Sequence, residues 1–257
     1  MPSLLFVGAH PDDDIFGVAR AVALHVDDPT LRFSLIHATD GEAGEIAPDS
    51  GVTRDELGVA RRRETREAWK AVGRLPDRHE WFGLPDGRLA EHPFDDLVDR
   101  IAAILDEDRP DVVVTFGSDG ITGHPDHIAV GEATTTAFHQ LVGTGAGLRR
   151  LLYCAIPLSW VNRWNEKRLA QGLDPWDADI LFHLRGVPDA SIGIDVDTAA
   201  VVNAVLAGVR AHKTQWSYQA MDSDPALVDS LRRDHYVIAW PATSDGHPPL
   251  TDVFEGL

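Results

Sequence analysis

Residues 4–14 read Leu-Leu-Phe-Val-Gly-Ala-His-Pro-Asp-Asp-Asp, an apolar run that ends in a histidine, a proline and three acids. The apolar part predicts a buried strand over 3–8. Proline and acidic residues are typical of the first turn of a helix, and the helical spacing continues over 15–25. This segment is therefore predicted to be a strand, a turn and a helix, the succession from which α/β folds are built.

The tripeptide His-Pro-Asp occurs a second time, again just after an apolar run. His124-Pro125-Asp126 follows the β-branched run over 111–116 and a short glycine-containing turn, and a helical pattern follows it. Ligands of open α/β sheets bind at the carboxyl ends of the strands. Both copies of the tripeptide are therefore expected at that edge, where two His/Asp clusters could converge on one metal ion. This placement points to a hydrolase.

The rest of the chain continues the alternation of strands and helices. Further strands are predicted over 32–38, 80–83, 111–116, 151–156 and 236–240, the last as an edge strand. Further helices are predicted over 52–73, 94–106, 126–141 and 198–212. The pattern predicts an α/β fold with a Rossmann-like, mostly parallel sheet and helices on both faces.

One domain is predicted over 1–257. Residues 1–150 would form its Rossmann-like core, and 151–257 would be a less regular part that supplies elements of the substrate pocket. The tryptophan-rich stretch from 157 to 179 is predicted to be irregular. Trp160, Trp164 and Trp176 lie in it, and Trp216 lies further on.

Composition excludes several classes of function. The 257 residues carry a formal net charge of −18, which disfavours binding to nucleic acid or to an anionic membrane surface. The single cysteine, Cys154, excludes an intrachain disulfide and fits a reducing compartment. No stretch reads as a signal peptide or a membrane span. A cytoplasmic protein that acts on a small molecule is expected, and a homo-oligomer is compatible with the sequence.

The two histidine-containing motifs have the residue types and spacing of a metal site. One carboxylate suffices to cap a helix, and three adjacent acids repel one another unless a cation lies among them. His10 and Asp13 are three residues apart, as are His124 and His127, so each pair can face one point. Two imidazoles and one carboxylate leave open positions on zinc, as catalytic sites require, and ferrous iron accepts the same donors.

Residues 7–14 together with Gly123-His124-Pro125-Asp126-His127 resemble the LmbE-like (PIG-L) superfamily of zinc-dependent N-deacetylases. Weaker matches lie along most of the chain: Thr39-Asp40-Gly41-Glu42, the helix with Arg61 and Glu64, Leu84-Pro85-Asp86-Gly87 and Ala211-His212-Lys213-Thr214-Gln215. The resemblance implies a Rossmann-like sheet and hydrolysis of an N-acetyl or similar amide, commonly on a glucosamine unit.

The resemblance also assigns roles to residues. It implies that His10, Asp13 and His127 bind zinc, that Asp12 is the general base and that His124 assists the tetrahedral intermediate. Asp126 would orient a ligand, and Asp14, which stands where the family usually has Glu, would act at the helix start or behind the ligands.

Three further residues are predicted to contact the substrate. Arg61 and Asp86 match positions that contact the sugar in mycothiol-pathway relatives, and Glu42 lies in a glycine-containing loop at the same sheet edge as His10. Thr122 stands where some of these relatives carry a tyrosine that polarises the amide carbonyl. Either His124 supplies that stabilisation alone, or another side chain enters from a loop.

The favoured interpretation is a zinc-dependent N-deacetylase of an amino-sugar compound. An amidase that cleaves a thiol–sugar conjugate would use the same metal centre with different pocket walls. A non-catalytic sugar- or metal-binding protein on the same scaffold would have no need of Asp12 and His124. A nucleotide-binding oxidoreductase is disfavoured because His10-Pro11 occupies the place of its glycine-rich fingerprint.

Overall fold

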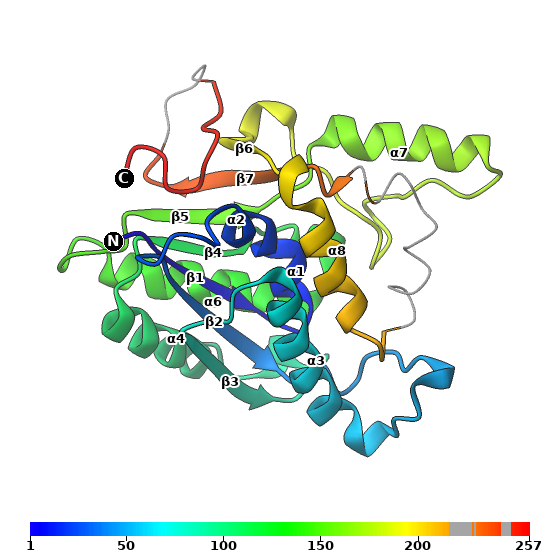
Figure 1. Cartoon of the computed structure of the whole chain (residues 1–257), viewed down its shortest axis with the longest axis horizontal. Helices are drawn as coiled ribbons and strands as arrows, with labels where there is room; N and C mark the ends of the chain where they lie inside the picture. Colours follow the sequence, from blue (N-terminus) through cyan, green and yellow to red (C-terminus); the bar gives the residue numbers. More distant parts are fainter. Residues whose placement is uncertain (216–227, 229, 243–247) are drawn as a thin grey trace. The chain divides into compact units, whose positions relative to one another are not determined.

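The computed structural model describes residues 1–215, 228, 230–242 and 248–257 (Figure 1). The chain divides into two compact units. Unit 1 comprises Met1–Leu89 and Asp197–Asp234, and unit 2 comprises Ala90–Val196 and His235–Leu257. Trp216 lies outside the described residues.

Unit 1 contains three parallel strands in the order β3-β2-β1, side by side in Figure 1. They are β1 (Ser3–Gly8), β2 (Arg32–Thr39) and β3 (Arg78–Leu84). Side chains on both faces of β1 and β2 are buried, as expected for near-continuous apolar runs in a parallel sheet. These strands confirm the predictions over 3–8, 32–38 and 80–83.

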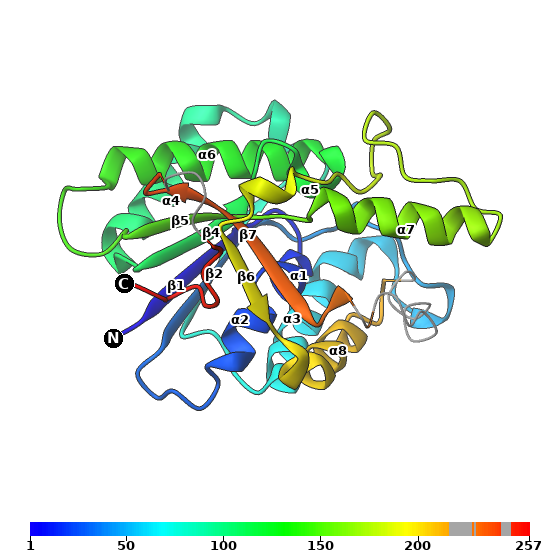
Figure 2. The same cartoon turned by 90° about the horizontal axis from the view of Figure 1, so that it is seen from above.

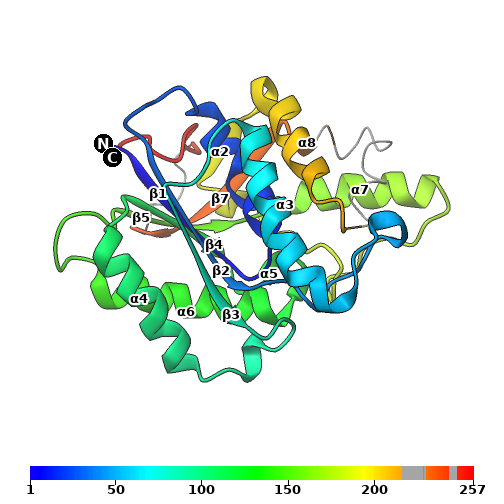
Figure 3. The ribbon, with the colours of Figure 1, turned by 60° about the horizontal axis from the view of Figure 1, so that its bottom comes forward.

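The described part of unit 1 includes the helices α1 (Asp13–Gly17), α2 (Ala19–Leu24), α3 (Leu57–Val72) and α8 (Val202–Ala211). Figure 3 shows α3 and α8 side by side, and the two helices pack so closely that a Cβ on Gly208 would lie 3.0 Å from Val72. The single helix predicted over 15–25 is instead two short ones. The backbone leaves the helical conformation at the buried Val18, where φ is −142°.

Unit 2 contains four strands in the order β4-β5-β7-β6. They are β4 (Val112–Phe116), β5 (Arg150–Cys154), β6 (Ile194–Asp197) and β7 (Arg233–Trp240, whose first two residues are counted with unit 1). β4 and β5 are parallel, and β7 runs antiparallel to β5. The prediction of β7 as an edge strand was wrong, because the four-residue strand β6 lies beyond it.

The helices of unit 2 are α4 (Phe94–Asp108), α5 (Gly120–Gly123), α6 (Pro125–Leu141) and α7 (Leu158–Ala170). Helix α6 packs on both α4 and β4, and Figure 2 shows it running alongside β4 and β5. A Cβ on Gly131 of α6 would lie 2.4 Å from the backbone oxygen of Phe116, so glycine is required at this contact.

Helix α7 corrects the prediction that the tryptophan-rich stretch is irregular throughout. Val161 is the one buried residue of that helix, so the sequence there has no apolar periodicity that indicates a helix. Its first turns are joined to the following loop by aromatic contacts. The rings of Trp160 and Trp164 lie 5.4 Å apart, and those of Trp164 and Trp176 lie 5.2 Å apart. The tryptophans therefore pack on one another.

Short 3₁₀ helices complete the described structure: Pro48–Ser50, Arg54–Glu56, Leu89–Glu91, Asp189–Ser191 and Ala199–Val201. Across the described residues the strands number seven and are mostly parallel, which confirms the predicted α/β class. None of the helices within those ranges has the length and apolar character needed to cross a membrane.

Candidate functional site

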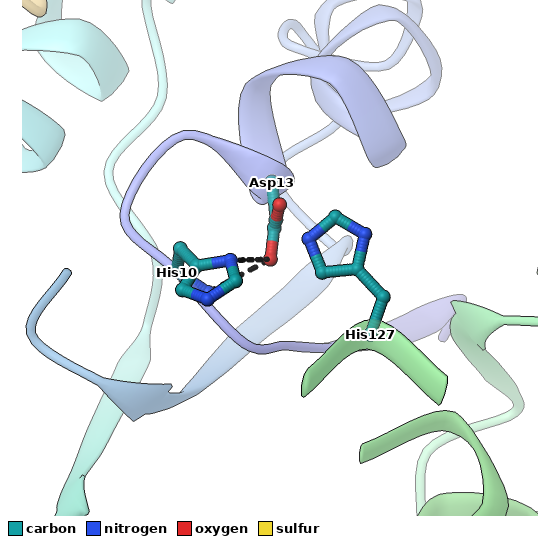
Figure 4. A group of neighbouring side chains, drawn as sticks. All are labelled: His10, Asp13 and His127. Atoms are coloured by element: carbon teal, nitrogen blue, oxygen red, sulfur yellow. Dashed lines mark hydrogen bonds and ion pairs between the residues drawn. The ribbon is translucent and has the colours of Figure 1, made fainter. Parts of the chain in front are cut away.

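The turn after β1 brings His10 and Asp13 together. The Asp13 carboxylate accepts hydrogen bonds from the backbone N–H of Ala9 at 2.9 Å and of His10 at 2.8 Å. The same oxygen lies 3.6 Å from Nδ1 of His10 (Figure 4). Two ligand atoms of a tetrahedral zinc ion, each ~2.1 Å from the metal, would be about 3.4 Å apart. His10 and Asp13 therefore fit the predicted role of paired metal ligands.

The carboxylate of Asp86 contacts the second ring nitrogen of His10, Nε2. Its Oδ1 is 3.1 Å from His10 Nε2, and its Oδ2 accepts a hydrogen bond from the N–H of Ala43 at 2.8 Å. Burial raises the pKa of Asp86, but the hydrogen bond from His10 and its charge outweigh this and lower the pKa below its ordinary value. A carboxylate that holds the second nitrogen of a metal-ligating histidine fixes the tautomer and orientation of the ring.

Glu42 is joined to the same turn. Its Oε1 accepts a hydrogen bond from the N–H of Asp86 at 2.8 Å. Its Oε2 is buried and has no hydrogen-bond partner among the described residues. Of the residues predicted to contact substrate, Glu42 therefore has an acceptor still to be satisfied.

Asp12 adopts a backbone conformation that L-residues rarely take, with φ at 124°. Its Oδ2 accepts a hydrogen bond from Arg61 at 3.1 Å. Arg61 also donates to the carbonyl oxygens of Pro11 at 2.6 Å and of Gly41 at 2.8 Å. Arg61 is 3% exposed and clamps the Asp12 turn, and its predicted contact with the sugar stays a prediction.

The three consecutive arginines of α3 have separate environments. Arg61 faces the interior, whereas Arg62 donates to Asp40 at 2.8 Å and Arg63 is exposed. The helix therefore presents one arginine to the candidate site and directs Arg63 to solvent.

Asp14 lies wholly inside unit 1. One of its oxygens accepts a hydrogen bond from the indole N–H of Trp69, and the other lies 3.3 Å from Nε2 of His37. That second oxygen also accepts the backbone N–H of Asp12 at 3.2 Å. Burial alone would raise the pKa of Asp14, but His37 outweighs it and the pKa falls to about 2. Asp14 is thus held in the interior beside the Asp12 turn, and its predicted supporting role stays a prediction.

His212, at the end of α8, is a buried neighbour that the sequence analysis left outside the site. It is 1% exposed. Burial lowers its pKa below the ordinary value, and the negative charges of Asp12 and Asp14 act in the opposite direction. The sequence marks His212 only as part of the match Ala211-His212-Lys213-Thr214-Gln215, and no local pattern there indicates that the end of α8 is buried.

The second His-Pro-Asp motif lies in unit 2 at the start of α6. His124 caps the helix: its Nδ1 accepts the backbone N–H of Asp126 at 3.1 Å. An accepting Nδ1 leaves the proton of a neutral imidazole on Nε2, from which it can be donated. Asp126 is fully buried.

His127 is oriented by its own surroundings. Its Nδ1 lies 3.0 Å from the carbonyl oxygen of Gly120, and its ring stacks on Phe116 at a centroid distance of 4.1 Å. Because a carbonyl can only accept, Nδ1 carries the proton and Nε2 is the unprotonated nitrogen of the neutral ring. This is the form of histidine that binds a metal ion.

A loop of unit 2 lies against the residues that precede His124. The N–H of Phe182 donates to Thr122 at 2.9 Å, and the N–H of Arg185 donates to Ile121 at 2.7 Å. The ring of Phe182 lies edge-on to His124 at 5.3 Å. The guanidinium of Arg185 packs directly on Gly123. The loop therefore places the side chains of Phe182 and Arg185 at His124 and Gly123, directly after Thr122.

The predicted ligands offer a suitable set of donors. His10, Asp13 and His127, the side chains drawn in Figure 4, each offer one ligand atom, the first two from unit 1 and the third from unit 2. A second set of donors, His10, His124 and Asp126, comes likewise from both units. In the first set the imidazole tautomers and the carboxylate contacts described above suit a divalent cation.

Comparison with known proteins supports a deacetylase family. Residues 5–138 match the family model described as PIG-L, GlcNAc-PI de-N-acetylase. A 1D-myo-inositol 2-acetamido-2-deoxy-alpha-D-glucopyranoside deacetylase of Saccharopolyspora erythraea is 30% identical over 100% of this chain and 94% of its own. A protein of the same name from Saccharomonospora viridis is 32% identical over 82% of this chain and 84% of its own.

Solved structures share the fold. N,N'-diacetylchitobiose deacetylase from Pyrococcus horikoshii has a TM-score of 0.61 at 18% identity, covering 92% of this chain and 83% of that one. GalB, a 4-carboxy-2-hydroxymuconate hydratase from Pseudomonas putida, has a TM-score of 0.67 at 17% identity, covering 96% and 100%. One scaffold therefore carries a hydrolase and a hydratase, and these likenesses show the fold alone.

Proposed function

We propose, because this chain belongs to the PIG-L (GlcNAc-PI de-N-acetylase) family, that it is a metal-dependent hydrolase that removes an acetyl or similar acyl group from the amide nitrogen of an amino sugar. The observation that carries the proposal is the His10–Asp13–Asp86 arrangement, with Asp12 held beside it by Arg61. A histidine flanked by two carboxylates fits a metal ligand better than a structural histidine.

In this proposal His10, Asp13 and His127 hold the ion. Zinc is the first choice, because two imidazoles and one carboxylate are a frequent ligand set of catalytic zinc, and ferrous iron is the alternative. A divalent ion bound there would supply Lewis-acid polarisation of the amide carbonyl and would lower the pKa of water. Asp86 would fix the ring of His10, and the Gly120 carbonyl would fix that of His127.

The proton transfers fall to residues of the two motifs. Asp12 takes a proton from the attacking water and passes it to the amide nitrogen, which leaves as the amine when the C–N bond breaks. The hydrogen bond from Arg61 fixes the direction of the Asp12 carboxylate. His124, with its proton on Nε2, donates a hydrogen bond to the oxygen that gains charge as the amide is attacked. Asp126 and Asp14 support these groups from the interior.

Recognition of the sugar is assigned to Glu42 and to loops of residues 151–257, within one catalytic domain over 1–257. The buried Oε2 of Glu42 would accept a hydrogen bond from a substrate hydroxyl. Arg61 and Asp86, which the family resemblance places on the sugar, would act here through Asp12 and His10. The proposed setting is the cytoplasm, supported by the single free cysteine. Assembly into a homo-oligomer is compatible with the proposal.

The deciding experiment measures acetate released from a panel of N-acetylglucosaminyl compounds that includes the 1D-myo-inositol glycoside. Metal-stripped protein is compared with protein reloaded with zinc or ferrous iron, beside the Asp12→Ala variant. Metal-dependent acetate that Asp12→Ala abolishes is the expected result.

Two other outcomes lead away from the deacetylase. Cleavage of a thiol–sugar conjugate without acetate release would identify the amidase. Tight metal binding with no turnover of any compound would identify a binding protein. Failure to bind metal would overturn the proposed roles of His10, Asp13 and His127.

A further inference from the structure

A chain of polar groups, buried at Asp14 and His37 and half-buried at its two ends, runs through unit 1 from Asp12 to His79 on the strand β3. The parallel register pairs Leu35 with His79 and His37 with Trp81, which brings the two histidines of neighbouring strands together. Nδ1 of His37 lies 2.8 Å from Nε2 of His79, and Nε2 of His37 lies 3.3 Å from Asp14. His37 is fully buried.

Aromatic packing holds the far end of this chain. Trp81 stacks on both imidazoles, with centroid distances of 4.7 Å to His37 and 4.4 Å to His79. The guanidinium of Arg62 lies 4.8 Å above the same indole. Neither imidazole can therefore turn without disturbing the stack.

The donors and acceptors can be assigned along the chain. A carboxylate only accepts, so the His37 nitrogen that faces Asp14 carries a proton. Burial, together with the charge of His37, lowers the pKa of His79 to about 3, so His79 is neutral at neutral pH. One hydrogen bond at 2.8 Å joins Nδ1 of His37 to Nε2 of His79, and Asp14 and His37 are joined by the ion-pair contact at 3.3 Å. The chain therefore runs from the N–H of Asp12 through Asp14 and His37 to His79.

We propose that His37 and His79 are positioning residues that act through Asp14 on the general base Asp12. Asp14 accepts the backbone N–H of Asp12 at 3.2 Å, and this contact holds Asp12 at its φ of 124°. A buried carboxylate that loses one of its polar partners shifts toward the partners that remain. Loss of His37 would therefore displace Asp14 and release the backbone of Asp12. The proposal rests on the proposed function, because it takes Asp12 as the base.

The first test compares His37→Leu with His37→Gln and with a control elsewhere in unit 1. The glutamine keeps an N–H donor toward Asp14, whereas the leucine has none. Thr198→Val is the control, because it removes a buried hydrogen bond to Leu231 at 2.7 Å far along the chain from Asp12. Zinc affinity, kcat and KM are measured for each metal-loaded protein.

The expected result separates positioning from stability. His37→Leu lowers kcat at least roughly tenfold while KM and zinc affinity change less than about threefold, because the base and not the metal is misplaced. His37→Gln recovers most of kcat, and His79→Phe gives an intermediate loss. Thr198→Val loses stability but keeps its kcat. A folded His37→Leu protein with the kcat of the native chain would overturn the proposal.

A second measurement does not depend on turnover. The hydrogen-exchange rate of the Asp12 amide is followed by NMR in the native chain and the same variants. Exchange is expected to be at least roughly tenfold faster in His37→Leu, beyond any increase in Thr198→Val, and near native in His37→Gln. An unchanged rate in His37→Leu contradicts the inference even if the protein proves not to be a deacetylase. Faster exchange without any activity would retain the inference and reject only the proposed function.

Discussion

Asp12 illustrates how one residue can be held against its own preference. A non-glycine residue in a sparsely populated backbone region costs on the order of 1–3 kcal/mol, which neighbouring contacts must offset. Here Asp14 accepts its backbone N–H, and Arg61 donates to its carboxylate and to the preceding carbonyl. The carboxylate is thereby fixed in direction before any substrate arrives.

Replacing Arg61 with lysine tests whether the hydrogen bonds of Arg61 fix the Asp12 turn. Lysine cannot reproduce a planar fork that serves Gly41, Pro11 and Asp12 at once, so both stability and catalysis should fall. We expect a loss of about 2 kcal/mol in the free energy of unfolding and a drop in kcat of roughly 10- to 100-fold. Urea unfolding measures the free energy of unfolding, and acetate release measures kcat. Arg63→Lys, at the exposed neighbouring position, should change neither, and equal effects of the two variants would contradict the assignment.

His79 predicts how stability depends on pH. Its folded-state pKa of about 3 lies below the 6.5 of an ordinary histidine. As pH falls through this window the unfolded chain takes up a proton that the folded chain does not, so the folded state loses stability. His79 contributes at most about 1.4 kcal/mol per pH unit to this loss.

The His79→Gln variant should therefore show a shallower fall in the free energy of unfolding between pH 6.5 and 4. Urea titrations at several pH values measure the slope. His139→Gln, which removes an exposed histidine, serves as the control and should keep the native slope. Identical slopes in all three proteins would refute a buried, neutral His79.

At the scale of the elements, the close contact of α6 with β4 bears on a site residue. Gly131 lets α6 approach the carbonyl of Phe116, and Phe116 in turn stacks on His127. An alanine would gain up to about 1 kcal/mol in helix propensity, but its Cβ would meet a backbone atom that cannot yield. We expect Gly131→Ala to destabilise the protein by about 1–3 kcal/mol.

Thermal unfolding measures that change, with Glu132→Ala at the next, exposed position as the control. The control should lie within about 0.5 kcal/mol of the native protein. If Gly131→Ala were as stable as the control, the close approach of α6 to β4 would have to be abandoned.

Elements with a strong apolar period could be predicted from the sequence, whereas those without one could not. β1, β2 and β4 are nearly continuous buried runs, and each follows directly from the residues. Helix α7 buries Val161 alone, and β6 spans four residues in which acids alternate with apolar side chains. Such segments take their structure from tertiary packing, which no local pattern reveals.

The residues of the candidate site also fall into those that the sequence indicates and those that it does not. The motif residues could be found because several chemically potent side chains stand close together in sequence. His37 and His79 are separated by a helix and join through strand register, so nothing nearby in the sequence marks either of them. The clamp formed by Arg61 depends equally on the way that α3 faces the turn after β1.

At the scale of the whole molecule, metal binding should be coupled to folding. An ion that binds the folded chain at 100 times its Kd adds about 2.7 kcal/mol of stability, and for a chain of this size that corresponds to roughly 5–10 °C in Tm. Metal-stripped protein should therefore melt earlier than zinc-loaded protein in differential scanning calorimetry.

Asp13→Asn is the control for this measurement, because it removes the ligand charge and keeps the shape of the side chain. Its Tm should not respond to zinc. A native protein whose Tm is equally indifferent to zinc would exclude a site of useful affinity.

Each unit is formed by two separate stretches of the chain, so unit 1 can be completed only late in synthesis on the ribosome. Unit 1 is begun by Met1–Leu89, but α8, which covers α3, arrives with Asp197–Asp234, about 145 residues later. At translation rates of about 5–20 residues per second, the apolar face of α3 waits on the order of 7–30 seconds for its partner. During that interval the nascent chain exposes the apolar face of α3, which can aggregate with other chains. We therefore expect chaperone supply and codon-dependent pausing to govern the yield of folded protein.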